Sequence, residues 1–306
     1  MQTAVLISTI FLTTLLLRWL KRVHLPSLPL PPGPTGYPII GNLLDVPVHM
    51  PWKKYRQWCD AYGDIVYFKI FNKQTIVIGS AQAAFDLLEK RSDIYSDRPP
   101  NVMHEMLTTT RWNFGNMRYS PEWRNHRREF HQFFHQRKVS VYQPIQLREC
   151  RAFLRRALHD PTHLAPKIRT IYAAIILKIV YDMEVTDVYH EFIKTAERVF
   201  LAISVAQIPG LFWVEFFPFL RYIPSWVPGT YFKKFAEEHI PMVQKMLDEP
   251  FYAVKRNMAV GKASDTTVAT LLERLCDEGD KKEDQLEKEL FVRDIMGVAY
   301  GGDYDN

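Results

Sequence analysis

The sequence predicts a mainly α (α+β) fold, in which a helical bundle carries one small β-sheet. Helical periodicity dominates from about residue 146 onward, whereas β-rich runs are confined to residues 65–71 and 74–78. Two strands among many helices are typical of the α+β class with helix dominant. The 306 residues, 47% of them hydrophobic, are enough for a deep core in one large domain or two modest ones.

Charge and cysteine usage narrow the function classes. A net charge of +5 is too mild to indicate a nucleic-acid-binding protein, and glutamates at positions 122 and 129 interrupt the basic run 118–138. The cysteines, Cys59, Cys150 and Cys276, are widely spaced and form no CxxC pair. This pattern favours a reducing compartment over a disulfide-stapled secreted fold. We therefore expect no nucleic-acid partner.

The N-terminal segment has the composition of a membrane anchor. Residues 1–17 carry no charge and are mostly apolar, and basic residues follow at positions 18, 21 and 22. A cleaved signal peptide would have its positive charge before the apolar run. Charge after the run favours retention, with the C-terminal side in the cytosol. We expect a single-pass anchor over residues 1–22, with an interfacial helix as the alternative, and a proline-rich hinge and lead-in over residues 23–50.

The first folded elements are expected to be a helix and a hairpin. Residues 51–62 place Trp and Tyr side chains at helical spacing, and Gly63 stands at the stop position. The two β-rich runs are joined at residues 72–73, which is typical of a hairpin. Ser80 is a candidate N-cap for a helix that continues to residue 91.

The helical part has one central element and one aromatic segment. Residues 167–182 are apolar nearly all round, as expected of a helix in the middle of a bundle. Residues 209–229 are dense in Phe, Trp and Pro, which fits either a packed linker or a lid that touches a bilayer or a hydrophobic ligand. The other helices are expected at residues 188–205, 231–258 (with Pro241 and Pro250 as candidate break points), 266–276 and from about 284 onward.

A basic helix over residues 121–135 is the strongest candidate for a binding site. Proline and an acid open its first turn, which suits a helix N-terminus. Trp123 and Arg127 are four residues apart and share one face, where an indole N–H and a guanidinium fork form a donor surface for a planar, doubly acidic ligand. The phenylalanines at positions 130, 133 and 134 should pack inward. The alternative is a basic surface helix with a half-buried Trp.

The same helix carries two histidines with the spacing of some zinc sites. His131 and His135 are four residues apart, but the glutamate of a metalloprotease motif is absent, as is an evident third ligand. We predict no metal site from these side chains.

Several motifs occur in the order found in one family. They are the proline-rich residues 31–34, the start of the hairpin at 62–65, the Ser-Asp-Arg-Pro segment at 96–99, the helix opening at 119–128, and the glycine-containing residues 297–302. In this order they resemble the membrane-bound cytochromes P-450, the haem-thiolate monooxygenases, in the form common in fungi. The resemblance runs through nearly the whole chain and covers somewhat more than half of a full-length member. Residues 51–306 are then an incomplete catalytic domain, truncated in its long central helix.

The resemblance implies a haem cofactor and assigns roles to the basic helix. Trp123 and Arg127 match the family's tryptophan-x-x-x-arginine pair, which holds the haem propionates, although Ser120 replaces the expected glycine. Arg98 is a further candidate for the same carboxylates. Arg124 and Arg128 are expected to face outward, either toward an acidic NADPH-cytochrome reductase, as in the family, or as solvated charges.

Other parts of the family pattern are missing from this sequence. None of the cysteines lies in the glycine- and arginine-containing loop that supplies the axial thiolate, and the family's Glu-x-x-Arg pair is absent. Asp303 matches the acid of the oxygen-handling motif, but Tyr304 stands where a threonine is expected. We expect the similarity to stop near Gly302, with the last residues arising from a truncated gene model or an unspliced intron.

Two functions follow as hypotheses. The first is a monooxygenase of the endoplasmic reticulum membrane, with its globular part in the cytosol. It would use O₂ and NADPH-derived electrons to hydroxylate a small apolar substrate, and this chain would lack turnover without the axial cysteine. The alternative is a membrane-tethered, non-enzymatic helical module that binds an acidic partner through its basic helix.

Overall fold

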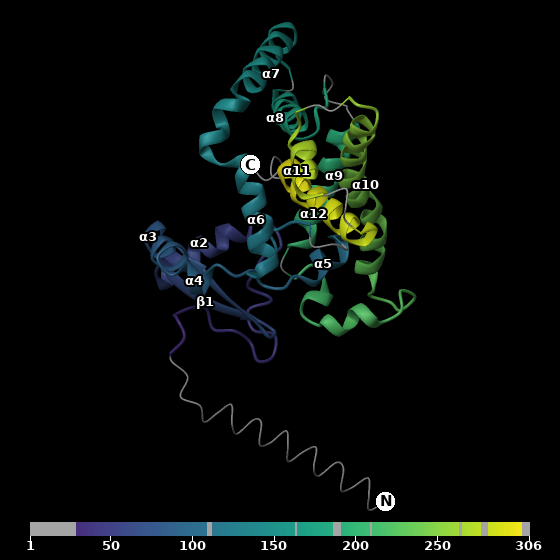
Figure 1. Cartoon of the computed structure of the whole chain (residues 1–306). Coiled ribbons are helices and arrows are strands. Elements are labelled where there is room, and N and C mark those ends of the chain that lie inside the picture. Colours follow the sequence, from purple (N-terminus) through teal and green to yellow (C-terminus); the bar gives the residue numbers. More distant parts are fainter. Residues whose placement is uncertain are drawn as a thin grey trace, which may run out of the picture. The chain divides into compact units, whose positions relative to one another are not determined.

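The chain folds into two compact units, one up to Phe85 and one from Asp86 onward. The computed structural model describes residues 29–108, 112–162, 164–185, 191–208, 210–262, 265–276 and 281–301. The predicted mainly helical fold with a small sheet is confirmed, because one antiparallel hairpin is the sheet of the described residues and the other regular elements there are helices (Figure 1).

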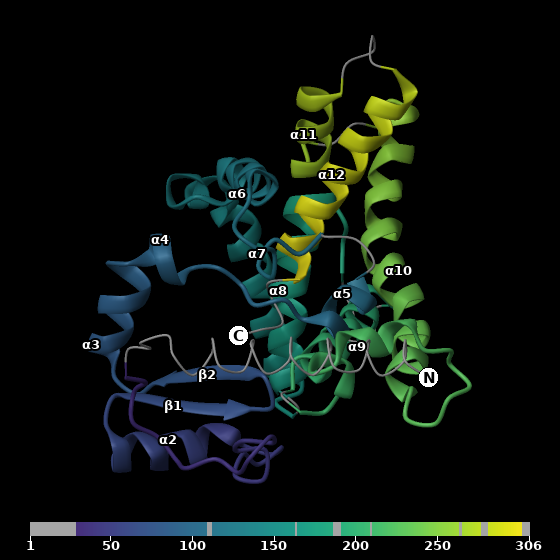
Figure 2. The ribbon, with the colours of Figure 1, turned by 90° about the horizontal axis from the view of Figure 1, so that it is seen from below.

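The first unit is built on a helix packed against a hairpin. Helix α2 (Pro51–Tyr62) precedes strands β1 (Ile65–Ile70) and β2 (Lys73–Ile78), which pair antiparallel from Ile65↔Ile78 to Ile70↔Lys73. Trp58 is buried against Phe68, with ring centroids 5.2 Å apart, and Figure 2 shows α2 lying along the hairpin. Both predicted elements are confirmed, with the turn one residue earlier than expected, at residues 71–72.

The lead-in segment is bonded to the edge of β1. The Tyr67 N–H donates to the Pro32 carbonyl at 2.9 Å, and the Asn42 N–H donates to the Lys69 carbonyl at 2.7 Å. Asn42 is buried, and its Oδ1 accepts from the Lys69 N–H at 3.2 Å. A Cβ on Gly33 would collide with the Tyr67 carbonyl oxygen, which explains the glycine within the proline-rich run. The structure thus folds residues 32–42 onto the sheet edge.

The helix predicted after Ser80 is broken up. The Ser80 Oγ accepts from the Ala83 N–H at 3.2 Å, so the predicted cap is confirmed. Helix α3 (Ala81–Ala84) then gives way to a π-helical turn, η1 (Phe85–Glu89), and α4 (Ser92–Tyr95) follows separately.

The second unit is a bundle of helices. Its longer members are α6 (Pro121–Phe134), α7 (Val139–His159), α8 (Leu164–Tyr181), α9 (Glu191–Ala206), α10 (Tyr231–Ala259) and α12 (Lys282–Gly301). Two shorter ones, α5 (Val102–Thr108) and α11 (Thr267–Leu275), complete it.

Helices α8 and α12 form the centre of this bundle. Leu177 and Val180 on α8 and Ile295 and Met296 on α12 are fully buried in one core cluster. Both views show α12 between α8 and α10 (Figures 1 and 2). A Cβ on Gly301 would lie 2.6 Å from the Phe200 ring, so the small residue permits the close approach of α9. The predicted central position of the apolar helix is confirmed.

Helix α10 is continuous through both of its candidate break points. It runs from Tyr231 to Ala259 with Pro241 and Pro250 inside it. A proline inside a helix costs about 3 kcal/mol, but Leu247, Phe251 and Val254 are buried on the same helix. Burial of each such side chain contributes roughly 1.5–3 kcal/mol. Packing around Pro250 therefore outweighs the backbone penalty, and a break at either proline was the wrong expectation.

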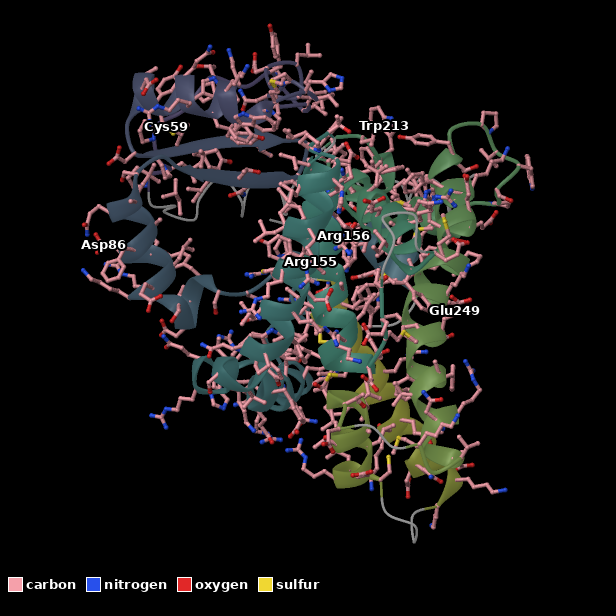
Figure 3. All side chains as sticks on the ribbon, turned by 90° about the horizontal axis from the view of Figure 1, so that it is seen from above. Cys59, Asp86, Arg155, Arg156, Trp213 and Glu249 are labelled. Carbon is pink, nitrogen blue, oxygen red and sulfur yellow. The ribbon has the colours of Figure 1, made fainter. Side chains whose placement is uncertain are left out.

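The aromatic segment after α9 is half packed and half exposed. It contains two 3-10 turns, η3 (Trp213–Glu215) and η4 (Pro218–Tyr222). Phe212 and Val214 are buried in a second core cluster with residues of α5 and α10. Tyr222 and Trp226, by contrast, are 80% and 81% exposed. Figure 3 labels Trp213 of this segment. The first half is therefore a packed linker, and the second half is exposed at the surface.

Candidate functional site

Helix α6 begins with a complete N-terminal cap. The Ser120 Oγ accepts from the Trp123 N–H at 3.1 Å, Pro121 occupies the first turn, and Glu122 places an acid there. These features satisfy a free backbone donor and match the positive end of the helix dipole. The serine that departs from the family's glycine therefore fixes the start of the helix one turn before the candidate binding residues.

Trp123 and Arg127 lie together on one face of α6, as predicted. The Arg127 guanidinium carbon is 5.1 Å from the centroid of the Trp123 ring. Tyr119 extends the group, with its ring 5.2 Å from that of Trp123 and the Arg124 guanidinium 5.7 Å from its own centroid. Within the described ranges, no carboxylate pairs with Arg127 and no acceptor takes the Trp123 indole N–H.

This donor set fits the carboxylates of haem. The indole N–H and the guanidinium are both uncommitted, one is half-buried and the other exposed, and both lie on the same helix face. An arginine fork forms short, charge-assisted bonds to a carboxylate, and an indole N–H adds a neutral one. The residues present are thus chemically suited to propionates.

The opposite face of α6 is buried. Phe130, Phe133 and Phe134 pack against the core cluster of the second unit, which confirms their predicted direction. His126 is only 5% exposed; its Nδ1 lies 3.0 Å from the Glu122 carbonyl, and its ring is 4.7 Å from that of Phe291. Sequence reasoning missed this histidine, although its spacing of four and seven residues from the phenylalanines places it on their face.

Glu129 connects α6 to α11. Its buried carboxylate accepts from the Arg274 guanidinium and, at 3.2 Å, from the Gln132 amide. The Arg274 guanidinium also lies 5.8 Å from the Phe133 ring centroid. Sequence reasoning did not single out this contact, because its partners are far apart in the chain. It holds α6 in place two residues after Arg127.

A buried ion-pair network joins α12 to α10 and approaches α6. Arg293 donates to Asp248 at 2.9 Å and to Asp294 at 2.7 Å, and the arginine is 9% exposed. Burial raises the pKa of Asp294, while the charges of Arg293 and His126 act in the opposite direction. The helix that carries the donor pair is therefore in electrostatic contact with the central helix of the bundle.

A cavity of about 770 Å³ opens beside the start of α6. Its walls come from residues 98–101, from α5, from the loop over residues 113–118 and from Gln207 and Arg221. Arg98 lines it and donates from Nε to the Gly115 carbonyl at 3.0 Å and from Nη1 to the Ser96 carbonyl at 3.2 Å. Neither Trp123 nor Arg127 is among the lining residues. Two of the donors of Arg98 are thus committed to carbonyl groups, and Ser120 and Glu122 at the start of α6 line the same cavity.

The remaining candidates named from the sequence are Asp303 and the cysteines. Asp303 lies outside the described residues. Cys59 is partly buried on α2 of the first unit (Figure 3), Cys150 is exposed on α7, and Cys276 follows α11. In the part of the chain that the structure describes, no group of three or more His, Cys, Asp or Glu side chains could hold a metal ion.

The predicted membrane anchor, residues 1–22, also lies outside the described residues. Among the helices that are described, none combines the length and the apolar character needed to cross a bilayer.

Comparisons with known proteins agree with this architecture. The family model for cytochrome P450 matches residues 31–302. The chain is 36% identical over 284 residues to cytochrome P450 monooxygenase COX1 of Coprinopsis cinerea, covering 92% of this chain and 54% of that protein. It is 35% identical to COX2 of the same fungus, covering 88% of this chain and 51% of that protein, and 36% identical to claR of Ampulloclitocybe clavipes, covering 90% and 50%. The chain spans about half the length of the curated relatives it matches. By the family model and these identities together, it belongs to the cytochrome P450 family.

Proposed function

We propose that this chain forms the N-terminal, propionate-binding part of a haem-thiolate monooxygenase, an oxidoreductase that inserts one oxygen atom from O₂ into a small apolar substrate. Haem, when bound, supplies the activation of dioxygen with electrons derived from NADPH. The observation that carries the proposal is the uncommitted pair of donors, Trp123 and Arg127, held 5.1 Å apart on a capped helix of a cytochrome P450 chain.

The surroundings of α6 support this role. A binding helix needs a fixed position, and this one is capped at Ser120, packed through His126 and joined to α11 through Glu129. Charge-assisted bonds to a carboxylate contribute roughly 1.5–3 kcal/mol each when their donors are already oriented. We do not extend the proposal to Arg98, because its Nε and Nη1 are engaged by backbone carbonyls.

The axial thiolate is proposed to come from elsewhere than the three cysteines of this sequence. Cys59 belongs to the first unit, Cys150 is exposed, and Cys276 follows a helix end. None of them is followed by the glycine- and arginine-containing sequence of the family's ligand loop. On this proposal the chain by itself binds haem without thiolate ligation and does not turn over.

The proposed partners follow from exposed surfaces and from composition. Arg124 and Arg128 are exposed on α6, and a basic face steers an acidic protein such as an NADPH-cytochrome reductase. A lipid bilayer and a place in the endoplasmic reticulum membrane are proposed from the uncharged residues 1–17 and the basic residues after them. The exposed Tyr222 and Trp226 would suit contact with the same bilayer.

Hemin titration of the purified chain tests the proposal. Arg127→Ala should weaken hemin binding by about 10- to 100-fold, because it removes a charge-assisted bond, and Arg127→Lys should recover part of the loss. Arg124→Ala is the matched control, since Arg124 is exposed on the same helix but lies over Tyr119 instead of Trp123. Equal hemin affinity for Arg127→Ala, Arg124→Ala and the wild type would refute the assignment.

The carbon monoxide spectrum of the reduced complex tests the ligation. The family's red-shifted band requires a thiolate on iron, so this chain should not show it. A red-shifted band that disappears in one cysteine variant would overturn the proposal that the axial ligand is not among these cysteines. If hemin does not bind at all, while an acidic protein binds the α6 face, the non-enzymatic module becomes the better description.

A further inference from the structure

The cavity beside α6 has walls that are fixed to one another. Asp97 receives the Arg118 guanidinium at 2.9 Å and the Tyr119 N–H at 2.9 Å. Arg98 joins the same two segments through the Gly115 carbonyl. The stretch before α5 and the loop after it are therefore held together by side chains of neighbouring positions. With a volume of about 770 Å³, the cavity is in the range that accommodates a drug-sized molecule.

The arginines that line the cavity all have partners. Arg118 is paired with Asp97, and Arg221 on η4 is paired with Glu105 on α5 at 3.2 Å. Arg98 is engaged by carbonyl oxygens. An ionic ligand would have to compete with these partners, so the lining favours a neutral one.

Polar groups that lack partners also line this cavity. His104 on α5 is 9% exposed, and among the described residues neither of its ring nitrogens has a hydrogen-bond partner. Nδ1 is completely buried, so Nε2 is the ring nitrogen that a ligand in the cavity could reach. Burial lowers the pKa of His104, so at neutral pH the ring is uncharged and offers one donor and one acceptor. The Asn116 carboxamide lines the same cavity and likewise has no partner in the described ranges.

The rest of the lining is mixed: Asn101, Asn113 and Gln207 are polar, and an apolar stretch lies among them. Pro99, Pro100 and Met117 contribute surface without hydrogen-bonding side chains. A hydroxyl group both donates and accepts, which matches a neutral imidazole and a carboxamide, and an aliphatic ring system matches the prolines and the methionine. An unsubstituted hydrocarbon would cover the His104 Nε2 and the Asn116 carboxamide without pairing them, whereas a hydroxylated one could bond to both.

We propose that this cavity binds an apolar skeleton that already carries hydroxyl groups, with His104 and Asn116 as the residues that recognise them. That this ligand is the substrate rests on the proposed monooxygenase function. The substrate would then be neutral and partly oxygenated rather than a bare hydrocarbon. A preceding hydroxylation or hydration of a hydrocarbon skeleton is the class of reaction that would supply it.

Equilibrium dialysis of the full 306-residue chain against radiolabelled probes tests the proposal. The probes are androstane, androstanediol and an androstane carboxylic acid, which share one ring skeleton. The wild type should bind the diol about tenfold more tightly than the hydrocarbon, and no less tightly than the acid. His104→Phe and Asn116→Leu should each weaken binding of the diol by about five- to tenfold and leave androstane unaffected.

His239→Phe provides the matched control, because His239 lies on α10 outside the cavity lining and accepts the same substitution. It should leave the preference for the diol intact. If His104→Phe fails to fold, as judged by its circular dichroism and thermal midpoint, Asn116→Leu decides the question. The proposal is overturned if the wild type binds androstane as well as the diol, binds neither, or prefers the acid.

Dialysis requires no haem, so its outcome separates from that of the hemin titration. A preference for the diol without hemin binding would retain this cavity as a site for hydroxylated ligands and reject the monooxygenase. Hemin binding without a preference for the diol would retain the monooxygenase and reject this cavity as a site for hydroxylated ligands.

Discussion

The guanidinium of Arg274 on α11 donates to the buried carboxylate of Glu129 on α6. This contact spans 145 positions of the chain, and it lies next to the two residues proposed to hold a haem carboxylate. Because Glu129 has few other donors, its environment depends on an arginine that is itself partly exposed. The stability of the binding helix and that of α11 are thereby linked.

Removal of Arg274 should destabilise the second unit. Arg274→Met removes the hydrogen-bonded charged partner of the buried Glu129 carboxylate and leaves only the longer contact with Arg128 at 3.7 Å, which should lower the free energy of unfolding by about 1–3 kcal/mol. Urea denaturation of the purified chain measures this. Arg256→Met on α10 is the control, because Arg256 is exposed and has no charged partner in the described part of the chain, so it should change the stability by less than about 0.5 kcal/mol. An equal effect of both variants would show that the pair with Glu129 contributes nothing.

The Ser120 Oγ, which caps α6, should make a measurable contribution to stability. Ser120→Ala removes the acceptor for the Trp123 N–H and should cost about 0.5–2 kcal/mol of stability. Ser120→Asp keeps an acceptor there and should be as stable as the wild type. Ser120→Gly, which restores the family's residue, should lower the stability by only a few tenths of a kcal/mol. Thermal denaturation ranks the series. Alanine as stable as aspartate would indicate that the serine does not cap the helix.

The carboxyl group of Asp97 should titrate at unusually low pH. Bonds from the Tyr119 N–H and the Arg118 guanidinium stabilise its charged form and hold its pKa below the ordinary value of 3.8. With a depressed folded-state pKa, the stabilisation is present above the unfolded value and is lost as the pH falls through the folded value. An NMR titration of the side chain should show the low value, and Arg118→Met should shift it upward. An unchanged titration in that variant would contradict the contribution of Arg118.

A side chain at Gly297 on α12 should force the buried Leu247 side chain to shift. A Cβ at this position would collide with the Leu247 side chain of α10. Gly297→Ala should therefore destabilise the chain by about 1–3 kcal/mol through overpacking, although alanine is the better helix former. The double variant Gly297→Ala with Leu247→Ala should lose less than the sum of the two single changes. Strict additivity in a urea-denaturation cycle would show that the two positions do not interact.

Local patterns in the sequence were sufficient for much of the fold. The helix over residues 51–62, the hairpin after it and the Ser80 cap each depend on neighbours in sequence, and the structure contains all of them. The pairing of Trp123 with Arg127 was predictable for the same reason, because it needs only the helical repeat.

The remainder depends on distant contacts that no local pattern contains. Pro250 sits inside α10 because Leu247, Phe251 and Val254 beside it are buried in a core cluster shared with other helices, and the Glu129 carboxylate is paired because Arg274 reaches it. The cavity draws its walls from positions between 98 and 221, so its neutral lining could be seen only after folding. His126 is the exception, since the helical repeat alone would have placed it on the buried face.

The bonds between residues 32–42 and β1 have a consequence for how the first unit is held. The Pro32 carbonyl and the Asn42 N–H engage backbone groups of β1 that another polypeptide strand could otherwise pair with, so the lead-in shields this edge of the hairpin. Deleting the lead-in should therefore expose β1 to intermolecular strand pairing.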